Sequence, residues 1–157
     1  MAPKRSTPKS KPRRRPTRPT PKPRPVKAHS PLGPVSPTEV RLVRINGAPA
    51  RGGGPGGEAW RIEAAGELAG DVFINMVDEP PIGPHPSIQI FLNRKSQGRR
   101  IGRVSYHAAC EASQYPVIYA HMRKSNIASR RAAEEAGFKD MSPLGYAQLI
   151  LRWSRTC

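Results

Sequence analysis

The alternation of apolar and polar residues divides most of the chain into short, strand-like segments. Residues 39–45 and 60–64 alternate polar with apolar residues, a period-two pattern that predicts half-buried strands. Residues 60–77 should form a β-hairpin whose turn centres on Gly66. Mainly apolar runs, bounded by turn-forming residues, predict the other strands, which are 71–77, 87–92, 117–122 and 146–153.

Two further segments have the spacing of helices. Apolar residues recur every three or four positions after Gly102, which predicts a helix that begins near this residue. A second helix is predicted over residues 126–136, because Ser125 or Asn126 can cap its start and Gly137 can end it.

Glycine and proline mark the long connections. Residues 46–59 include six glycines and are expected to form a flexible loop. Residues 79–86 read EPPIGPHP, and proline is excluded from helices and central strands, so a second loop is expected there. The order is then four strands, a helix, a strand, a helix and a strand. This order predicts an α/β fold with a mixed sheet and parallel crossovers.

Charge and proline are concentrated at the N-terminus. The chain has 27 Lys+Arg against 11 Asp+Glu, and residues 1–28 hold eleven of the basic residues and none of the acids. Eleven of the 19 prolines lie in residues 1–37. We therefore expect a disordered, basic, proline-rich arm over residues 1–37 and a mildly basic domain over residues 38–157.

Composition excludes several classes of protein. Two cysteines cannot staple a small disulfide-rich domain, and no apolar run is long enough to cross a membrane. No apolar segment follows the basic N-terminus, as a secretory signal would require. The sequence predicts a cytoplasmic protein with free thiols and no membrane partner.

The arm suits contact with phosphate backbones. Its cations would bind RNA, DNA or the ribosome through residues 1–28 by counterion release, without reading sequence. It has no Phe, Trp or Tyr on which a base could stack. A solubilising leader, a ligand for a proline-recognition domain and a targeting role are the alternatives.

The loop at residues 93–100 has the features of an anion site. It joins a strand to the start of a helix, where unpaired N–H groups and the helix dipole favour a phosphate. Gly98 and Gly102 permit close approach of the backbone. Positive side chains surround them, namely Lys95, Arg99, Arg100 and Arg103. A solvated basic turn is the alternative interpretation.

This loop resembles that of the GCN5-related N-acetyltransferase (GNAT) superfamily. The family pattern Q/R-x-x-G-x-G/A matches residues 97–102, except that Arg100 replaces the middle glycine. A second family block matches from Asn126 to the Gly137-Phe138 pair. Within it, Ser129 is similar to the serine found in the branch of the family that modifies ribosomal-protein N-termini. The resemblance covers residues 39–155 and implies a GNAT-like fold.

The resemblance also implies where acetyl-CoA would bind, with no metal. The backbone near the end of the fourth strand would pair with pantetheine, and the strands would splay apart near Leu92. Backbone N–H groups of residues 98–102 would hold the pyrophosphate, while Asn126 and Ser129 would lie beside the thiol. The complete set of implied acetyl-CoA residues is Ile90, Phe91, Leu92, Gln97, Gly98, Arg99, Arg100, Ile101, Gly102, Arg103, Asn126 and Ser129.

The catalytic side chains are less fully specified. The family's base lies near the start of the fourth strand, where His85 is the titratable residue and Glu79 is the nearest acid. The tyrosine that often protonates the thiolate is replaced by Ala133. Ser129 or Tyr119 would substitute for it, and proximity alone supplies much of the rate in such transfers.

Other candidate groups have simpler explanations. His107 and Cys110 share a helix face, but zinc would need two more ligands. His121 is interpreted as a strand residue that faces a core or cavity rather than as a base. The glycine-rich residues 46–59 replace the helices that wall the acceptor site in GNAT proteins, which would leave that site open.

The sequence thus predicts an acetyl-CoA-dependent N-acetyltransferase that acts on a protein or peptide amine. The alternative is a non-catalytic protein with a degenerate GNAT domain that binds CoA, nucleic acid or a ribonucleoprotein. Ala133 and Arg100 favour the alternative, whereas Gln97 and Asn126 favour the enzyme.

Overall fold

The computed structural model describes residues 32–156, which form one seven-stranded sheet with two α-helices. The strand order is β1-β2-β3-β4-β5-β7-β6, and every neighbouring pair is antiparallel except β4–β5. The strands are β1 (Val40–Ile45), β2 (Glu58–Ala64), β3 (Glu67–Glu79), β4 (Gly83–Leu92), β5 (Val117–Arg123), β6 (Lys139–Asp140) and β7 (Gln148–Ser154). The helices are α1 (Ile101–Ala112) and α2 (Ile127–Glu135), with short 3-10 turns η1 (Pro37–Glu39) and η2 (Arg94–Ser96).

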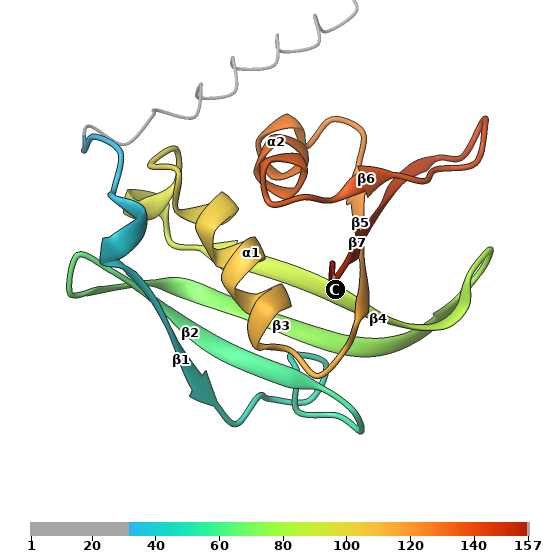
Figure 1. Ribbon diagram of the computed structural model, residues 1–157, viewed down its shortest axis with the longest axis horizontal. Coiled ribbons are helices and arrows are strands. Elements are labelled where there is room, and N and C mark those ends of the chain that lie inside the picture. The colour runs from blue at the N-terminus through green and yellow to red at the C-terminus, as the bar shows by residue number, and fades with distance from the viewer. Residues whose placement is uncertain (1–31, 157) are drawn as a thin grey trace, which may run out of the picture.

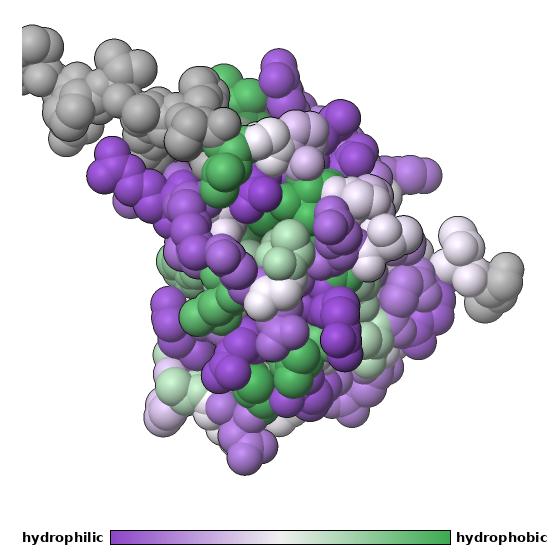
Figure 2. Space-filling view, turned by 90° about the vertical axis from the view of Figure 1, so that its left-hand side faces the viewer, coloured by the Kyte–Doolittle hydropathy of each residue, from purple (hydrophilic) through white to green (hydrophobic). Residues whose placement is uncertain are grey.

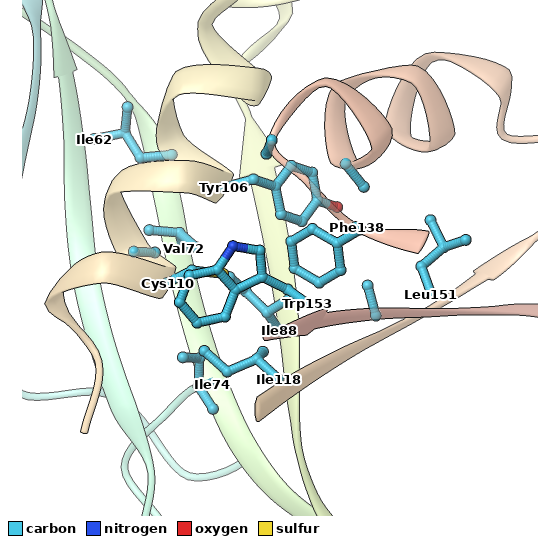
Figure 3. Packing of buried hydrophobic residues seen from close by; sticks show 14 of the residues in the cluster. Ile62, Val72, Ile74, Ile88, Tyr106, Cys110, Ile118, Phe138, Leu151 and Trp153 are labelled. Carbon is cyan, nitrogen blue, oxygen red and sulfur yellow. The ribbon is translucent and has the colours of Figure 1, made fainter. Parts of the chain in front are cut away.

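The predicted mixed α/β fold is confirmed, and its two helices lie on the same face of the sheet (Figure 1). Val72, Ile74 and Ile88 point from β3 and β4 toward α1, where they pack with Cys110 (Figure 3). Full burial of such a branched side chain contributes about 1.5–3 kcal/mol to folding. Neither α-helix in the described residues has the length and apolarity to cross a bilayer.

The prediction that residues 79–86 form a proline-rich loop is wrong. β3 runs to Glu79 and β4 already begins at Gly83, so most of this segment is strand. Pro84 and Pro86 pair with Asp78 and Met76 of β3. The prolines are two residues apart, so their nitrogens face the same edge of β4. That edge meets β5 only at Ser87, so proline interrupts no ladder there.

The glycine-rich segment is also more ordered than expected. Asn75 of β3 holds it through two hydrogen bonds: Asn75 Oδ1 accepts from the N–H of Gly52, and Nδ2 donates to the carbonyl of Ala50, both at 2.8 Å. The guanidinium of Arg51 lies 4.9 Å from the ring centroid of Phe91. The segment therefore covers part of the sheet face that is opposite the helices.

The core extends into the predicted arm. Val35 is buried in the main apolar cluster, and its N–H donates to the carbonyl of Arg99 at 3.0 Å. For residues 32–37, the expected separation of arm and domain therefore does not hold. The rest of the predicted arm lies outside the described residues. The side of the domain near β1 is mainly polar, with small, separate apolar patches (Figure 2).

We expect Val35→Ala to lower the free energy of unfolding by about 1–2 kcal/mol, because it removes two buried methyl groups. Val43→Ala is the matched control, since Val43 is 37% exposed on β1 and should change stability little. Urea unfolding of the full chain measures both values. Equal effects would show that Val35 does not belong to the core.

Candidate functional site

A pocket of about 600 Å³ opens where β4 ends and where α1 and α2 begin. Backbone and side chains from these three elements form its walls, so a ligand in it would touch segments far apart in the sequence. The lining residues are Ile90, Phe91, Leu92, Gln97, Gly98, Arg100, Ile101, Gly102, Arg103, Tyr106, Asn126, Ala128, Ser129, Arg131, Ala132 and Glu135.

The start of α1 supplies an anion site to this pocket. Gly98 and Arg100 both have left-handed backbone, with φ of 71° and 63°, and Arg100 is the N-cap of α1. This reversal places the helix N-terminus at the pocket wall. The first N–H groups of a helix have no partner within it, and the helix dipole makes them attractive to a phosphate.

Arg103 is the basic side chain of α1 that lines the pocket. Its Nε atom is buried and has no hydrogen-bond partner among the described residues. Its Nη1 atom lies 3.4 Å from Glu135 of α2. A buried N–H without a partner costs free energy, so a bound anion would complete this group.

Two other expected cations lie elsewhere. The Arg99 Nε atom donates to the carbonyl of Gly33 at 2.9 Å, and Arg99 does not line the pocket. Lys95 forms an ion pair with Glu67 at 2.7 Å, which lowers the pKa of that carboxyl. These residues are close together along the loop, which is why the sequence predicted one cluster of cations, but their side chains point in different directions.

The edge of β4 that faces β5 is open beside the pocket. The N–H of Asn93 donates to the carbonyl of Ala69, on the β3 side of β4, at 2.8 Å. The nitrogens of Pro84 and Pro86 have no hydrogen to donate to β3, which fits an arrangement in which the even-numbered nitrogens of β4 point away from β3. By alternation, the N–H groups of Ile90 and Leu92 face away from β3, toward β5.

The splay therefore starts earlier than expected. β4 and β5 are paired only at Ser87 and Tyr119, so the strands separate after Ser87 rather than near Leu92. The open edge of β4 is long enough to offer both Ile90 and Leu92 to a bound ligand.

The start of α2 forms the opposite wall. The side-chain oxygen of Asn126 accepts from the N–H of Ser129 at 3.3 Å and caps the helix, which leaves its amide N–H₂ as a donor. Tyr106 of α1 is hydrogen-bonded to Ser129, and burial raises the pKa of this phenol to about 12. Ala133 is fully buried and brings no polar group.

A second cluster lies on the sheet face away from the helices. His85 of β4 is 2% exposed, and its Nε2 atom lies 2.7 Å from Nε2 of His121 on β5. The ring of Tyr119 meets that of His85 edge-on, with centroids 5.1 Å apart. Burial lowers the pKa of His121; His85 adds to this effect, and Glu79 opposes it.

The structure divides the residues expected from the sequence between these two places. Eleven of the twelve residues expected to bind acetyl-CoA line the pocket, and Arg99 is the exception. Ser129 lies in the pocket, whereas His85, Tyr119 and Glu79 belong to the opposite side. Sequence reasoning missed Tyr106, which carries no motif of its own.

The remaining candidate groups form no site. Within residues 32–156, no three His, Cys, Asp or Glu side chains gather as metal ligands do. Cys110 is fully buried in the core, and burial raises the pKa of its thiol. A buried thiol of this kind is a poor nucleophile.

Comparisons with known proteins agree with the architecture. No protein-family model and no curated protein sequence matches the chain. A GNAT-family acetyltransferase from Streptococcus agalactiae superposes with a TM-score of 0.54 at 14% identity, over 63% of this chain and 66% of that one. The GNAT domain of S. lividans PAT gives 0.52 at 12% identity, over 63% of this chain and 61% of that one.

A third solved structure is RimJ from Mycobacterium smegmatis, determined in complex with CoA-disulfide. It gives a TM-score of 0.50 at 20% identity, over 62% of this chain and 53% of RimJ. This chain thus spans two thirds or less of these three proteins. At such identities the likeness concerns the fold, and the chain has the GNAT fold that the sequence predicted.

We expect Asn126→Ala to lower the free energy of unfolding by about 1 kcal/mol, because the cap of α2 is lost. Asn126→Asp should leave stability nearly unchanged, since aspartate caps helices as well as asparagine does. Thermal or urea unfolding compares the two variants. An equal loss in both would contradict the capping role.

Proposed function

We propose that this protein is an acetyl-CoA-dependent N-acetyltransferase. The observation that carries the proposal is the junction of two features in one pocket: the open edge of β4 and the N-terminus of α1. An extended amide chain can hydrogen-bond to such an edge, and a phosphate can bind such a helix start. Pantetheine joined to a pyrophosphate has both parts in this order.

The residues present fit the chemical groups of acetyl-CoA. The C=O of Ile90 and the N–H of Leu92 would pair with the pantetheine amides, while the N-terminus of α1 would bind the pyrophosphate. Arg103 and Arg131 line the pocket and would bind phosphate oxygens. Asn126 and Ser129 lie on the opposite wall, beside the path toward the splay.

The proposed reaction is direct transfer. The acceptor nitrogen bonds to the thioester carbonyl carbon, the C–S bond breaks, and the thiolate takes up a proton. The N–H of Ile90 would stabilise the developing oxyanion, because it faces the splay and has no partner on β5. Binding both reactants at this gap supplies the proximity on which the rate largely depends.

Hydroxyl groups replace the tyrosine that is absent at Ala133. Tyr106 comes from α1 rather than α2, lines the same pocket and is hydrogen-bonded to Ser129. A pKa near 12 keeps the phenol protonated at neutral pH, so the Tyr106–Ser129 pair holds a proton that the thiolate would take up. This arrangement supports the enzyme over a non-catalytic CoA-binding module.

The proposed acceptor is an amine on a peptide or protein. No α-helix in the described part of the chain covers the sheet face that carries His85 and His121, and the segment that includes Arg51 lies over Phe73, Phe91 and Asn75. An extended peptide end has access to such a surface. We further propose that the protein is cytoplasmic and that residues 1–28 hold it near nucleic acid or ribosomes.

Titration of acetyl-CoA tests the proposal. Binding at 100 times the dissociation constant should stabilise the native state by about 2.7 kcal/mol, visible as a raised melting temperature. Release of free thiol with a library of peptides then separates an enzyme from a CoA-binding protein. Absence of a thermal shift at millimolar acetyl-CoA would refute both forms of the proposal.

Two arginines provide a matched test of the binding mode. Arg103→Ala should weaken acetyl-CoA binding about 10-fold or more, because charge-assisted hydrogen bonds to phosphate are lost. Arg99→Ala should leave affinity within about 3-fold, since its side chain is bonded to Gly33 outside the pocket. Isothermal titration calorimetry measures both, and the opposite ranking would reject the assignment.

A further inference from the structure

We propose that His121 is the catalytic base and that His85 is the residue that positions it. The inference rests on the proposed acetyl transfer and adds the route by which the acceptor loses its proton. It is carried by the contact between two imidazole rings at the place where β4 and β5 separate.

The hydrogen bonds assign a proton to each ring. His85 Nδ1 lies 2.6 Å from the carbonyl oxygen of Gly83, which can only accept, so Nδ1 of His85 carries a hydrogen. Neutral His85 then has a bare Nε2. Its neighbour at 2.7 Å, His121 Nε2, must therefore donate. The Nδ1 atom of neutral His121 is left as an acceptor.

This free acceptor is on the accessible ring. His85 is 2% exposed, whereas His121 is half-buried on a strand that has left β4 two residues earlier, at Tyr119. Among the described residues nothing is bonded to His121 Nδ1. His121 can thus meet an incoming amine, while His85 is enclosed and acts only through its neighbour.

The surroundings suit a base that is neutral before reaction and charged after it. Glu79 at the end of β3 favours the imidazolium of His121, and His85 on β4 and burial disfavour it. Tyr119 on β5 packs against His85, and Arg152 of β7 pairs with Tyr119 in the sheet. Ile150, the β7 partner of His121, is apolar.

The proton balance is complete without another reagent. His121 Nδ1 takes one proton from the acceptor ammonium, and the neutral amine attacks the thioester carbon. As the C–S bond breaks, the thiolate takes a proton from the Tyr106–Ser129 pair. The second nitrogen proton is released to solvent, which returns a proton to that pair. His121 returns its proton to solvent before the next turnover.

Nitrogen NMR of the full chain tests the arrangement without any substrate. Imidazole ¹⁵N shifts should show the Nδ1–H tautomer for His85 and the Nε2–H tautomer for His121. His121 should titrate below the ordinary histidine value of about 6.5. An Nδ1–H tautomer at His121 would overturn the proposal, whether or not the protein binds acetyl-CoA.

Kinetics test the role itself, with the peptide of the library that wild type acetylates. His121→Gln should lower kcat about 100-fold or more, while the thermal shift with acetyl-CoA stays. His107→Gln is the matched control, because His107 is exposed on α1 and should leave kcat unchanged. A His121→Gln variant within about 3-fold of wild type would refute the base while leaving the transferase proposal intact.

The pH profile separates positioning from structure. Activity requires neutral His121, so kcat should fall as pH decreases through its pKa. His85 accepts from His121 Nε2 and contributes to the pKa of His121, so His85→Gln should shift the midpoint of the acidic limb. An unchanged midpoint in His85→Gln would reject the positioning role of His85.

Discussion

The unequal pairing of β4 is the constraint on which the rest of this molecule depends. One edge is paired with β3 from Gly83 to Leu92, whereas the other meets β5 at Ser87 alone. Backbone N–H and C=O groups need partners, so the open half of that edge is free to pair with water or with an extended ligand. α1 begins at Ile101, and its N-terminus lies at the same opening.

The opening has two different sides, and this difference gives the proposed transfer its direction. The helix side carries the backbone at the N-terminus of α1, Arg103 and the hydroxyls of Tyr106 and Ser129. The outer side carries the coupled imidazoles and, at the end of β3, a carboxylate. Acyl donor and amine would therefore approach from opposite faces of the sheet and meet only where β4 and β5 separate, so neither obstructs the other.

Local signals in the sequence predicted the parts of the site that depend on local structure. Residues 97–102 and Asn126 are turn and cap positions, whose chemistry is fixed by a few neighbours, and all of them except Arg99 line the pocket. The contact of His85 with His121 depends on the packing of strands 36 residues apart, so no local pattern indicates it. The strand at residues 83–86 could not be predicted for a similar reason. Its prolines are tolerated only because one edge of β4 is unpaired there, and this is a property of the whole sheet.

Arg100 is the main departure of this sequence from the family pattern, and its backbone conformation has a cost in free energy at the edge of the pocket. It occupies the position of the pattern's middle glycine, and its backbone is left-handed, a conformation that costs a side-chain-bearing residue about 1 kcal/mol. The preceding residue, Arg99, is bonded to Gly33 and Val35 through side chain and backbone. These contacts hold the loop against the core, so the burial of Val35 offsets strain at the turn before α1. The last residues before β1 are thus part of the site's framework, which neither the charge nor the proline content of the N-terminal region indicates.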